Sequence, residues 1–419
     1  MRVKRDLVEE LSSIFDGVAQ HTAAKRPDQA WIFDARAKYW KQLLNARENG
    51  KGIAWVSFCF VPEIFWAMDL IPVPMEATFG ILSGMPKGIM EYLDISERFV
   101  PDHICAANKG MIGAAVTGDI IRPDVIVHAS QPCDSGISSY TNVAEYMGVP
   151  YFCVDTPYWQ DEATFEYLGE EMERLVAFLE ETTGRKMDFD RLREAVKYSN
   201  QAHEYYLKIN ELRKLKPSPL PGALLGHNAG SFLAMAGTPE LVDYCRAQYE
   251  YALARVARGE AQVPDEKLRL AWVYVAVMHY PGLFDWLEKE HKAVVVMDML
   301  AHYINTPVED LSTPKKLYRG LAEKLANMPM ARESRGPLAY YAEAVMDVCR
   351  DYNCDAAVFS GHMACKHGWA VIKLIKDRVQ EELGIPMMVF DLDCFDPRVT
   401  SHETVRGKLN DFLSMVKSR

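Results

Sequence analysis

The sequence AAVFSGHMACKHG, Ala356 to Gly368, decides how the rest of the chain is interpreted. Its first four residues are apolar or small and predict a buried strand, which we expect the Ser360-Gly361 pair to end. Cys365 follows in a short loop, and from Trp369 the apolar residues recur at helical spacing. Ligands of α/β proteins bind beyond the carboxyl ends of parallel strands. The stretch therefore predicts a strand, a loop that carries chemistry and a helix.

The same order of features occurs earlier in the chain. Residues 125–129 (VIVHA) predict a strand, residues 131–134 (QPCD) form the loop, and a helical pattern follows. Cys133 and Cys365 thus occupy equivalent positions in two strand–loop–helix units. Repeated β-α-β order predicts an α/β fold with two doubly wound parallel-sheet domains, similar to flavodoxin or Rossmann folds, joined by a helical segment. The predicted parts are an N-terminal α/β domain with leading helices (1–160), a helical bridge (161–262) and a C-terminal α/β domain (263–419).

Apolar spacing and turn residues predict the other elements. Helices are expected over 5–48 (two of them), 161–183, 189–214, 238–259, 282–287, 338–350 and 400–416. Strands or extended segments are expected over 52–58, 71–76, 149–155, 268–277, 293–298 and 385–391.

Composition limits the classes of function. The chain has 419 residues, is 49% hydrophobic and carries a formal net charge of −11. No basic run is long enough for a nucleic-acid partner, and no apolar run approaches the roughly 20 residues that span a bilayer. The first fifteen residues carry charges throughout and do not predict a signal peptide. We therefore expect a cytoplasmic enzyme that binds neither nucleic acid nor membrane.

Three of the nine cysteines are candidate ligands. Their number is odd and no CxxC pair occurs, so disulfides are not expected and any ligands must come from distant parts of the chain. Cys105, Cys133 and Cys365 lie at strand ends or helix starts, where backbone N–H groups favour a thiolate, the ligand of iron–sulfur clusters. The alternative is that they are small buried hydrophobic residues. Burial is favoured for Cys59, Cys153 and Cys394.

Other residues could take part in acid–base chemistry. Glu76 follows a rigid, proline-containing stretch and is either a base near the open end of the sheet or a surface acid. Three histidines flank strand ends: His279, His362 and His367. Each could be a proton donor or a thioester contact, and the alternative is an ordinary structural role. No GxGxxG or P-loop occurs, so we do not expect this chain to hydrolyse ATP itself.

An ordered set of segments resembles the 2-hydroxyacyl-CoA dehydratase family. That family also contains the cluster-bearing subunits of ATP-dependent benzoyl-CoA reductase and the double-cubane cluster proteins. The resemblance extends from about residue 50 to residue 418. The matching segments are Val61-Pro62-Glu63 to Val73, Ile104-Cys105, Pro123 to Asp134, Gly148 to Pro157, Thr183 to Lys186, Leu212 to Pro219, and Cys365 to Arg398.

The resemblance implies a cofactor and a reaction. It implies that Cys105, Cys133 and Cys365 carry a [4Fe-4S] cluster between the two sheet domains, with one iron open to substrate. It also implies a separate ATP-hydrolysing iron–sulfur activator that delivers one electron, so that a 2-hydroxyacyl-CoA loses water through a ketyl radical. A larger double-cubane cluster is the alternative, and Cys59, Cys153, Cys354 or Cys394 would then supply the further ligands.

The sequence departs from the family at one place. Dehydratase α-type subunits tend to carry a hydroxyl residue near the Phe-Pro that opens the first helix, but here Ser57 is out of register and Cys59 stands near that place. Ser57 and Glu76 are the expected catalytic residues. We expect the iron–sulfur subunit of a 2-hydroxyacyl-CoA dehydratase, paired with a related subunit or with itself. The alternatives are an ATP-dependent reductase component and a non-catalytic scaffold subunit.

Overall fold

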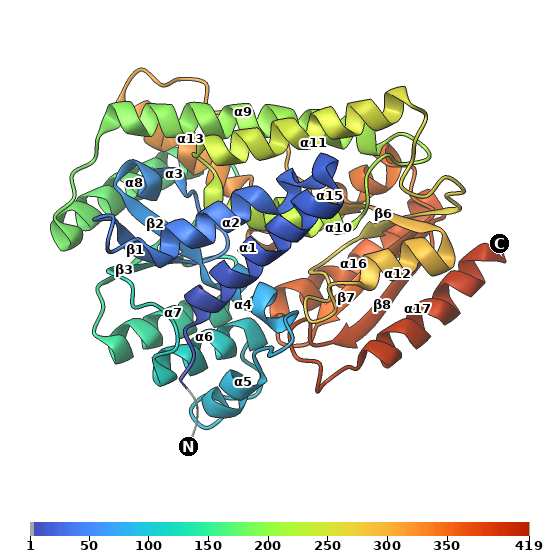
Figure 1. Cartoon of the computed structure of the whole chain (residues 1–419), viewed down its shortest axis with the longest axis horizontal. Coiled ribbons are helices and arrows are strands. Elements are labelled where there is room, and N and C mark those ends of the chain that lie inside the picture. Colours follow the sequence, from blue (N-terminus) through green and yellow to red (C-terminus); the bar gives the residue numbers. More distant parts are fainter. Residues whose placement is uncertain (1–3, 419) are drawn as a thin grey trace.

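Two parallel sheets with the same strand order form the centre of the molecule (Figure 1). The computed structural model describes residues 4–418. The first sheet has the order β2-β1-β3-β4 and the second has the order β6-β5-β7-β8. All of the strand pairs are parallel, which confirms the prediction of an α/β fold with two doubly wound sheets. The strands are β1 (Gly52–Val56), β2 (Leu70–Pro74), β3 (Val125–Ala129), β4 (Tyr151–Val154), β5 (Leu268–Trp272), β6 (Ala293–Asp298), β7 (Ala356–His362) and β8 (Met387–Leu392).

Burial on both faces explains why the inner strands read as continuous apolar runs. Every residue of β1, β3, β5 and β7 is buried, as expected for parallel strands covered by helices. The edge strand β4 is only partly covered, and its Cys153 is exposed. The prediction that Cys153 is buried is therefore wrong, whereas Cys59 and Cys394 are buried as predicted.

Helices surround both sheets (Figure 1). Those before the second sheet are α1 (Leu7–Lys25), α2 (Trp31–Leu44), α3 (Glu63–Ala67), α4 (Met75–Ser83), α5 (Met90–Ser96), α6 (Ala106–Thr117), α7 (Asp134–Met147), α8 (Glu162–Thr183), α9 (Phe189–Arg213), α10 (Ala223–Met235) and α11 (Pro239–Ala257). The later ones are α12 (Leu283–Trp286), α13 (Pro314–Ala326), α14 (Ala331–Arg335), α15 (Leu338–Asp351), α16 (Lys366–Leu383) and α17 (His402–Lys417).

Several strands are shorter than the extended segments that the sequence predicts. Residues 71–76 were expected to be extended, but Met75 and Glu76 form the first turn of α4. The register of β1 with β2 ends at the pair of Val56 and Pro74, so the chain has no strand to pair with beyond that point. Similarly, the second sheet uses only residues 268–272 of the predicted strand over 268–277. The helix α10 was not predicted.

The Ser360-Gly361 pair was predicted to end the strand. It instead belongs to β7. The Ser360 hydroxyl donates to the Val275 carbonyl at 2.6 Å and accepts from the Trp272 indole at 2.9 Å. A Cβ at position 361 would lie 2.1 Å from the Trp369 ring. Glycine is therefore present because β7 and the start of α16 approach closely, and not because the chain turns there.

The helical segments connect the two sheets. The helix α8 packs on β3 and β4, and α13, from the last third of the chain, packs along α8. The long helices α9 and α11 lie side by side, at the top of the view in Figure 1, and α10 contacts both β2 and β6. The domain boundaries at 160 and 262 stay a prediction. Within residues 4–418, no helix has the length and apolar character needed to cross a membrane.

Candidate metal centre

Each of the three candidate cysteines stands at the start of a helix. Cys105 is the N-cap of α6, Cys133 the N-cap of α7 and Cys365 the N-cap of α16. Cys133 and Cys365 come shortly after β3 and β7, which hold corresponding places in the two sheets. In both sheets the chain reverses direction of winding beside this strand, which is where α/β proteins bind ligands.

The loops of Cys105 and Cys133 are joined by hydrogen bonds. The Ser135 hydroxyl accepts from the backbone N–H of Cys105 at 3.2 Å and from the Asn108 amide at 3.1 Å. The backbone N–H of Gly136 donates to the Cys133 sulfur at 3.1 Å. These contacts hold the N-termini of α6 and α7 next to each other, with both sulfurs at the carboxyl end of the first sheet.

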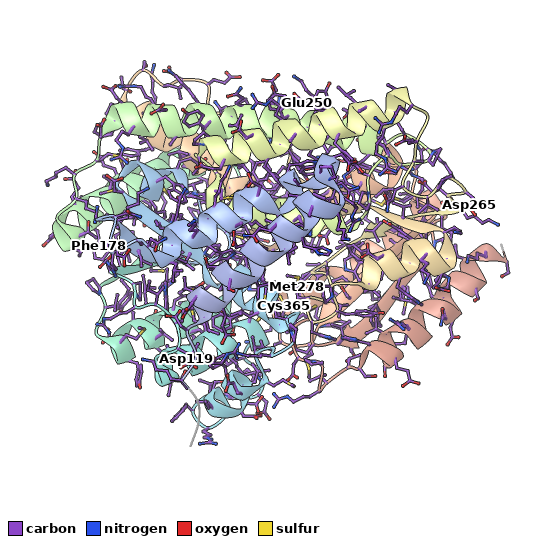
Figure 2. The ribbon with its side chains drawn as sticks, viewed as in Figure 1. Asp119, Phe178, Glu250, Asp265, Met278 and Cys365 are labelled. Atoms are coloured by element: carbon purple, nitrogen blue, oxygen red, sulfur yellow. The ribbon has the colours of Figure 1, made fainter. Side chains whose placement is uncertain are left out.

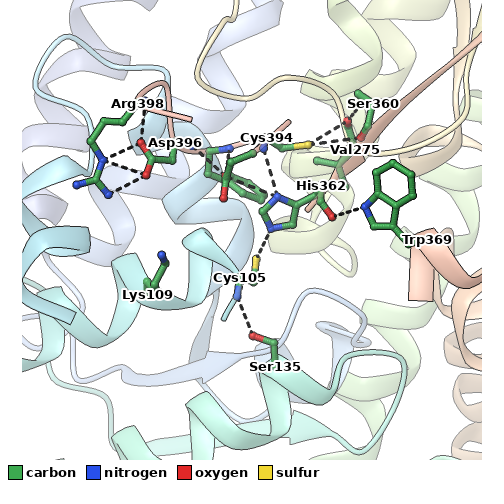
Figure 3. A network of polar contacts seen from close by, with 12 residues as sticks. Cys105, Lys109, Ser135, Val275, Ser360, His362, Trp369, Cys394, Asp396 and Arg398 are labelled. Carbon is green, nitrogen blue, oxygen red and sulfur yellow. Dashed lines mark hydrogen bonds and ion pairs between the residues drawn. The ribbon is translucent and has the colours of Figure 1, made fainter. Parts of the chain in front are cut away.

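Contacts from the second half of the chain reach the same place. Asp134, which follows Cys133, forms an ion pair at 2.8 Å with Lys366, which follows Cys365. His362, the last residue of β7, places Nε2 3.3 Å from the Cys105 sulfur (Figure 3). Figure 2 labels Cys365 and Met278 near the middle of the molecule, and Met278 packs on α4 of the first half. These contacts bring the loops that carry the three cysteines near one another, between the two halves of the chain.

The hydrogen bonds of His362 determine which of its nitrogens carries the proton. The backbone N–H of Cys394 donates to Nδ1 at 3.3 Å, so Nδ1 is the acceptor and Nε2 carries the hydrogen (Figure 3). Burial lowers the pKa of His362, Asp393 raises it and Lys109 lowers it further. The imidazole is therefore neutral, and its Nε2–H points to the Cys105 sulfur.

The environment of the free thiols differs from the expectation. Burial raises the pKa of Cys105 well above its ordinary value, and the nearby Cys133 raises it further. Burial likewise raises the pKa of Cys133, with Glu76 and Cys365 adding to the effect. At Cys105 and Cys133, desolvation by burial thus outweighs the attraction of the helix N-terminus for a thiolate. Metal binding would deprotonate these thiols.

The chemistry of the donor set, three thiols, suits an iron–sulfur cluster. Within residues 4–418, no three His, Cys, Asp or Glu side chains converge as the ligands of one metal ion would. In an iron–sulfur cluster each thiolate binds its own iron, so the sulfurs stand apart. Three half-buried thiols at three helix starts, one of which accepts a backbone N–H bond, suit that arrangement.

Residues 58–416 match the family described as 2-hydroxyglutaryl-CoA dehydratase, D-component. The chain belongs to this family. Its relatives include the (R)-phenyllactyl-CoA dehydratase alpha subunit of Clostridium sporogenes, which is 22% identical and matches over 85% of this chain and 87% of its own length. The (R)-2-hydroxyisocaproyl-CoA dehydratase alpha subunit of Clostridioides difficile is 21% identical over 94% and 97%. A benzoyl-CoA reductase subunit of Thauera aromatica is 22% identical over 91% and 92%.

Membership of the dehydratase D-component family implies an iron–sulfur cluster.

Glu76, in the first turn of α4, lies beside the candidate cluster ligands. Its Oε2 is 2.5 Å from the Tyr140 hydroxyl, while that hydroxyl is also 2.9 Å from the Val56 carbonyl oxygen. Burial raises the pKa of Glu76 to about 7, and the Tyr140 hydrogen bond offsets part of the rise. Its Oε1 is buried and has no partner within residues 4–418. Glu76 can therefore hold or release a proton near neutral pH.

Ser57 has a clear structural contact. Its backbone N–H donates to the Val127 carbonyl at 3.1 Å, and its hydroxyl accepts from the Ala129 N–H at 3.3 Å. These bonds extend the pairing of β1 with β3 by one step. A catalytic role for Ser57 stays a prediction.

The two other candidate histidines have different surroundings. His367 lies 3.9 Å from the Asp134 carboxylate, beside the Asp134–Lys366 ion pair. His279 stacks on His402, with ring centroids 5.3 Å apart.

The sequence reasoning missed a chain of ion pairs behind Cys105. Lys109 on α6 pairs with Glu97 at 3.0 Å, and Arg398 pairs with Glu97 at 3.1 Å. Arg398 also pairs with Asp396 at 2.7 Å (Figure 3). These contacts tie the helix of Cys105 to the loop after β8. The available signal in the sequence was a single lysine, Lys109, among the mostly small and apolar residues 106–117.

A surface cavity of about 350 Å³ lies elsewhere. Lining residues 262–265 come just before β5, and Lys292 comes just before β6. The cavity therefore lies at the amino end of the second sheet, away from the cysteines. Its lining residues are Gln262, Val263, Pro264, Asp265, Asp285, Glu288, Lys289 and Lys292.

Proposed function

We propose that this chain is the iron–sulfur subunit of a 2-hydroxyacyl-CoA dehydratase and that Cys105, Cys133 and Cys365 hold a [4Fe-4S] cluster. The proposal rests on one observation: contacts connect the N-termini of α6 and α7, in the first half of the chain, with the end of β7 and the start of α16 in the second half. The Asp134–Lys366 ion pair and the His362–Cys105 hydrogen bond make that connection. Family membership and the names of several dehydratase relatives support the reaction class.

The chain's own residues would bind the substrate and move protons around such a cluster. When bound, a three-thiolate cluster supplies a single electron and an open iron that accepts a leaving hydroxyl. Glu76 would exchange a proton with the substrate, because its pKa of about 7 suits both directions of transfer. Ser57 would contact the thioester from the carboxyl end of β1. The His362 Nε2–H would hold Cys105 in place.

The proposal includes partners. Relatives named as alpha subunits support a related second subunit, and a second copy of this chain is the alternative. The absence of a P-loop from the sequence supports a separate ATP-hydrolysing iron–sulfur activator. The substrate would be an acyl-CoA thioester, and the compartment the cytoplasm.

Serine variants test the ligand assignment. Cys133→Ser should lose the visible absorbance of the cluster in anaerobically purified protein, because a hydroxyl is a poor ligand for iron. Cys245→Ser is the matched control, since Cys245 is fully buried in α11 and should leave the absorbance unchanged. Equal absorbance in the two variants would contradict the assignment.

Iron and sulfide counts separate the proposal from its alternatives. About four irons per chain support a single cluster, about eight support a double-cubane reductase component, and none supports a scaffold subunit. The similarity to the benzoyl-CoA reductase subunit is the observation that favours the reductase alternative. An anaerobic assay with activator and ATP over a panel of 2-hydroxyacyl-CoA thioesters then tests the reaction itself. Formation of no enoyl-CoA from any of them would contradict the dehydratase proposal.

A further inference from the structure

The imidazole of His362 has both of its nitrogens engaged. Its Nε2 lies 3.3 Å from the Cys105 sulfur, and its Nδ1 accepts the backbone N–H of Cys394 at 3.3 Å (Figure 3). A ring nitrogen that accepts a hydrogen bond carries no proton, so the ring is neutral and its single proton is on Nε2. His362 is therefore a hydrogen-bond donor to the Cys105 sulfur.

The surroundings of the ring keep it in this orientation. His362 is 3% exposed, and the Phe395 ring packs edge-on against it, with ring centroids 5.3 Å apart. The nearby Asp393 carboxylate is held by other donors. Its Oδ1 is 3.6 Å from Nδ1 and accepts the backbone N–H groups of Phe395 and Asp396 at 2.8 and 3.0 Å. Packing and hydrogen bonds thus fix the direction of the Nε2–H.

These contacts direct His362 towards the metal centre and away from substrate chemistry. The sequence left it as a proton donor, a thioester contact or a structural residue. A general acid must present its proton to the reacting group. Here the only proton of the buried ring points to the sulfur of Cys105, a proposed cluster ligand. His362 therefore acts on that sulfur.

A second sulfur of the candidate centre accepts a hydrogen bond from the backbone. The Gly136 N–H donates to the Cys133 sulfur at 3.1 Å. A backbone donor is present whichever of the ordinary side chains, proline excepted, the sequence places there. The donor to Cys105, in contrast, depends on the side chain at position 362. This position is therefore one where the amino-acid sequence controls the environment of a ligand sulfur.

A hydrogen bond to a ligand sulfur affects how readily a cluster takes up an electron. Hydrogen bonds to the sulfurs are among the factors that set the reduction potential of iron–sulfur clusters. Reduction adds one negative charge, part of which resides on the thiolate sulfurs. A hydrogen bond strengthens as its acceptor becomes more negative, so the donor stabilises the reduced form more than the oxidised form. Burial of the ring enlarges the effect, because little water screens it.

We propose that His362 is a positioning residue that raises the reduction potential of the cluster by donating its Nε2–H to the Cys105 sulfur. The oxidised form gains one electron, which the separate iron–sulfur activator loses, and the Nε2 proton stays on the imidazole. His362 thus makes the transfer from the activator more favourable. The inference rests on the proposed function, because it requires Cys105 to be a cluster ligand.

The reduction potential of the iron-loaded protein tests this role. His362→Phe keeps a planar ring but removes the N–H donor. At a fixed potential, the ratio of reduced to oxidised protein should fall about tenfold, which is a shift of about 59 mV to lower potential for one electron. Anaerobic redox titration followed by electron paramagnetic resonance measures this ratio. His362→Gln, whose amide can still donate, should recover most of the shift.

His203→Phe is the matched control for this substitution. His203, on α9, is also buried, and the Phe232 ring packs edge-on against it. The same replacement there should leave the reduction potential unchanged. An equal shift in the two variants would show that altered packing, and not the lost N–H donor, moves the potential, and would overturn the inference.

A measurement on the unaltered protein covers the case in which His362→Phe loses its iron. That variant leaves the Cys394 N–H without its acceptor, which could disturb the loop after β8. Pulsed electron paramagnetic resonance of the reduced protein, isotope-labelled only at histidine nitrogens, should detect a weak coupling between the cluster spin and one imidazole nitrogen. Absence of this coupling would contradict the hydrogen bond itself.

The outcomes distinguish the inference from the function on which it rests. If the unaltered protein binds no iron after anaerobic reconstitution, the proposed cluster and the inference both fail. If it binds iron and His362→Phe leaves the potential unchanged or raises it, only the inference fails. A lower potential in His362→Phe, with recovery in His362→Gln and no shift in His203→Phe, supports it.

Discussion

The hydrogen bonds of the Tyr140 hydroxyl explain how the Glu76 carboxyl can hold a proton. The Tyr140 hydroxyl lies within hydrogen-bond distance of both the Val56 carbonyl oxygen and the Glu76 carboxyl, but it can donate fully to only one of them. If Glu76 is protonated, it donates to Tyr140, and Tyr140 donates to Val56. This arrangement agrees with a Glu76 pKa raised to about 7 by burial.

Replacement of Glu76 tests its role at the residue scale. Glu76→Gln keeps the size of the side chain but cannot transfer a proton, so we expect the dehydration rate to fall by about 10² to 10⁴. The visible absorbance and iron content should stay unchanged, because Glu76 is not among the proposed ligands. Loss of iron in this variant would instead assign Glu76 to the metal centre.

His203, on α9, gives a prediction for stability against pH. Burial, followed by the nearby Lys324, lowers its pKa from 6.5 to about 4. The folded state therefore binds fewer protons than the unfolded state, so this contribution to stability is complete above pH 6.5 and is lost as the pH falls towards 4. His203→Gln should lessen the loss of unfolding free energy between about pH 7 and about pH 5 by about 2 kcal/mol.

The control for this experiment is His21, which is exposed on α1. His21→Gln should leave the pH dependence of the urea midpoint as it is in the unaltered protein. If His203→Gln also leaves it unchanged, the histidine does not titrate as its burial indicates.

At the scale of elements, one close approach positions the start of α16. Gly361 in β7 lies against the Trp369 ring, and the Trp369 indole donates to the His362 carbonyl at 3.1 Å. The end of β7 and the start of α16, which flank Cys365, are therefore in direct contact. The loop that carries the cysteine is rigid because the elements that flank it are in direct contact.

Substitution of Gly361 should therefore affect the site as well as stability. In Gly361→Ala the new methyl group would overlap the Trp369 ring, and we expect a loss of about 1–3 kcal/mol of unfolding free energy. The displaced helix start should also reduce iron incorporation, measured after anaerobic reconstitution. Gly226→Ala, where a Cβ meets nothing within 4 Å, is the control and should incorporate iron normally.

At the scale of the whole molecule, a buried ion pair links distant parts of the chain. Lys324 on α13 pairs with Glu63 on α3 and also contacts Ser199 on α9. Both charged side chains are buried, so each depends on the other for compensation. This contact holds a helix from the last third of the chain against the first sheet domain.

A double-mutant cycle measures that link. Lys324→Met leaves the Glu63 charge buried and unpaired, so we expect a loss of about 3–5 kcal/mol of unfolding free energy. The double variant Glu63→Gln/Lys324→Met should be more stable than the sum of the two single losses implies, by urea unfolding. Strict additivity would show that the two charges do not interact.

The parallel, doubly wound character of both sheets could be predicted because apolar runs and turn residues alternate with helical patterns along the chain, whereas the strand order came from the structure. The ends of elements were less predictable where tertiary neighbours decide them. Pairing with β1 ends at Pro74 and starts α4 there, and the Trp369 ring keeps Gly361 within β7.

The sequence by itself determined that Cys105, Cys133 and Cys365 precede helices, because cap positions and strand ends are encoded locally. Only the tertiary structure decided that their loops come together, since the Asp134–Lys366 and Cys105–His362 contacts form only when the two halves of the chain pack against each other. Folding also raises the pKa of the Cys105 and Cys133 thiols, against the effect expected of a helix start. Burial removes water from the sulfurs, and that loss of solvation outweighs the attraction of the helix ends.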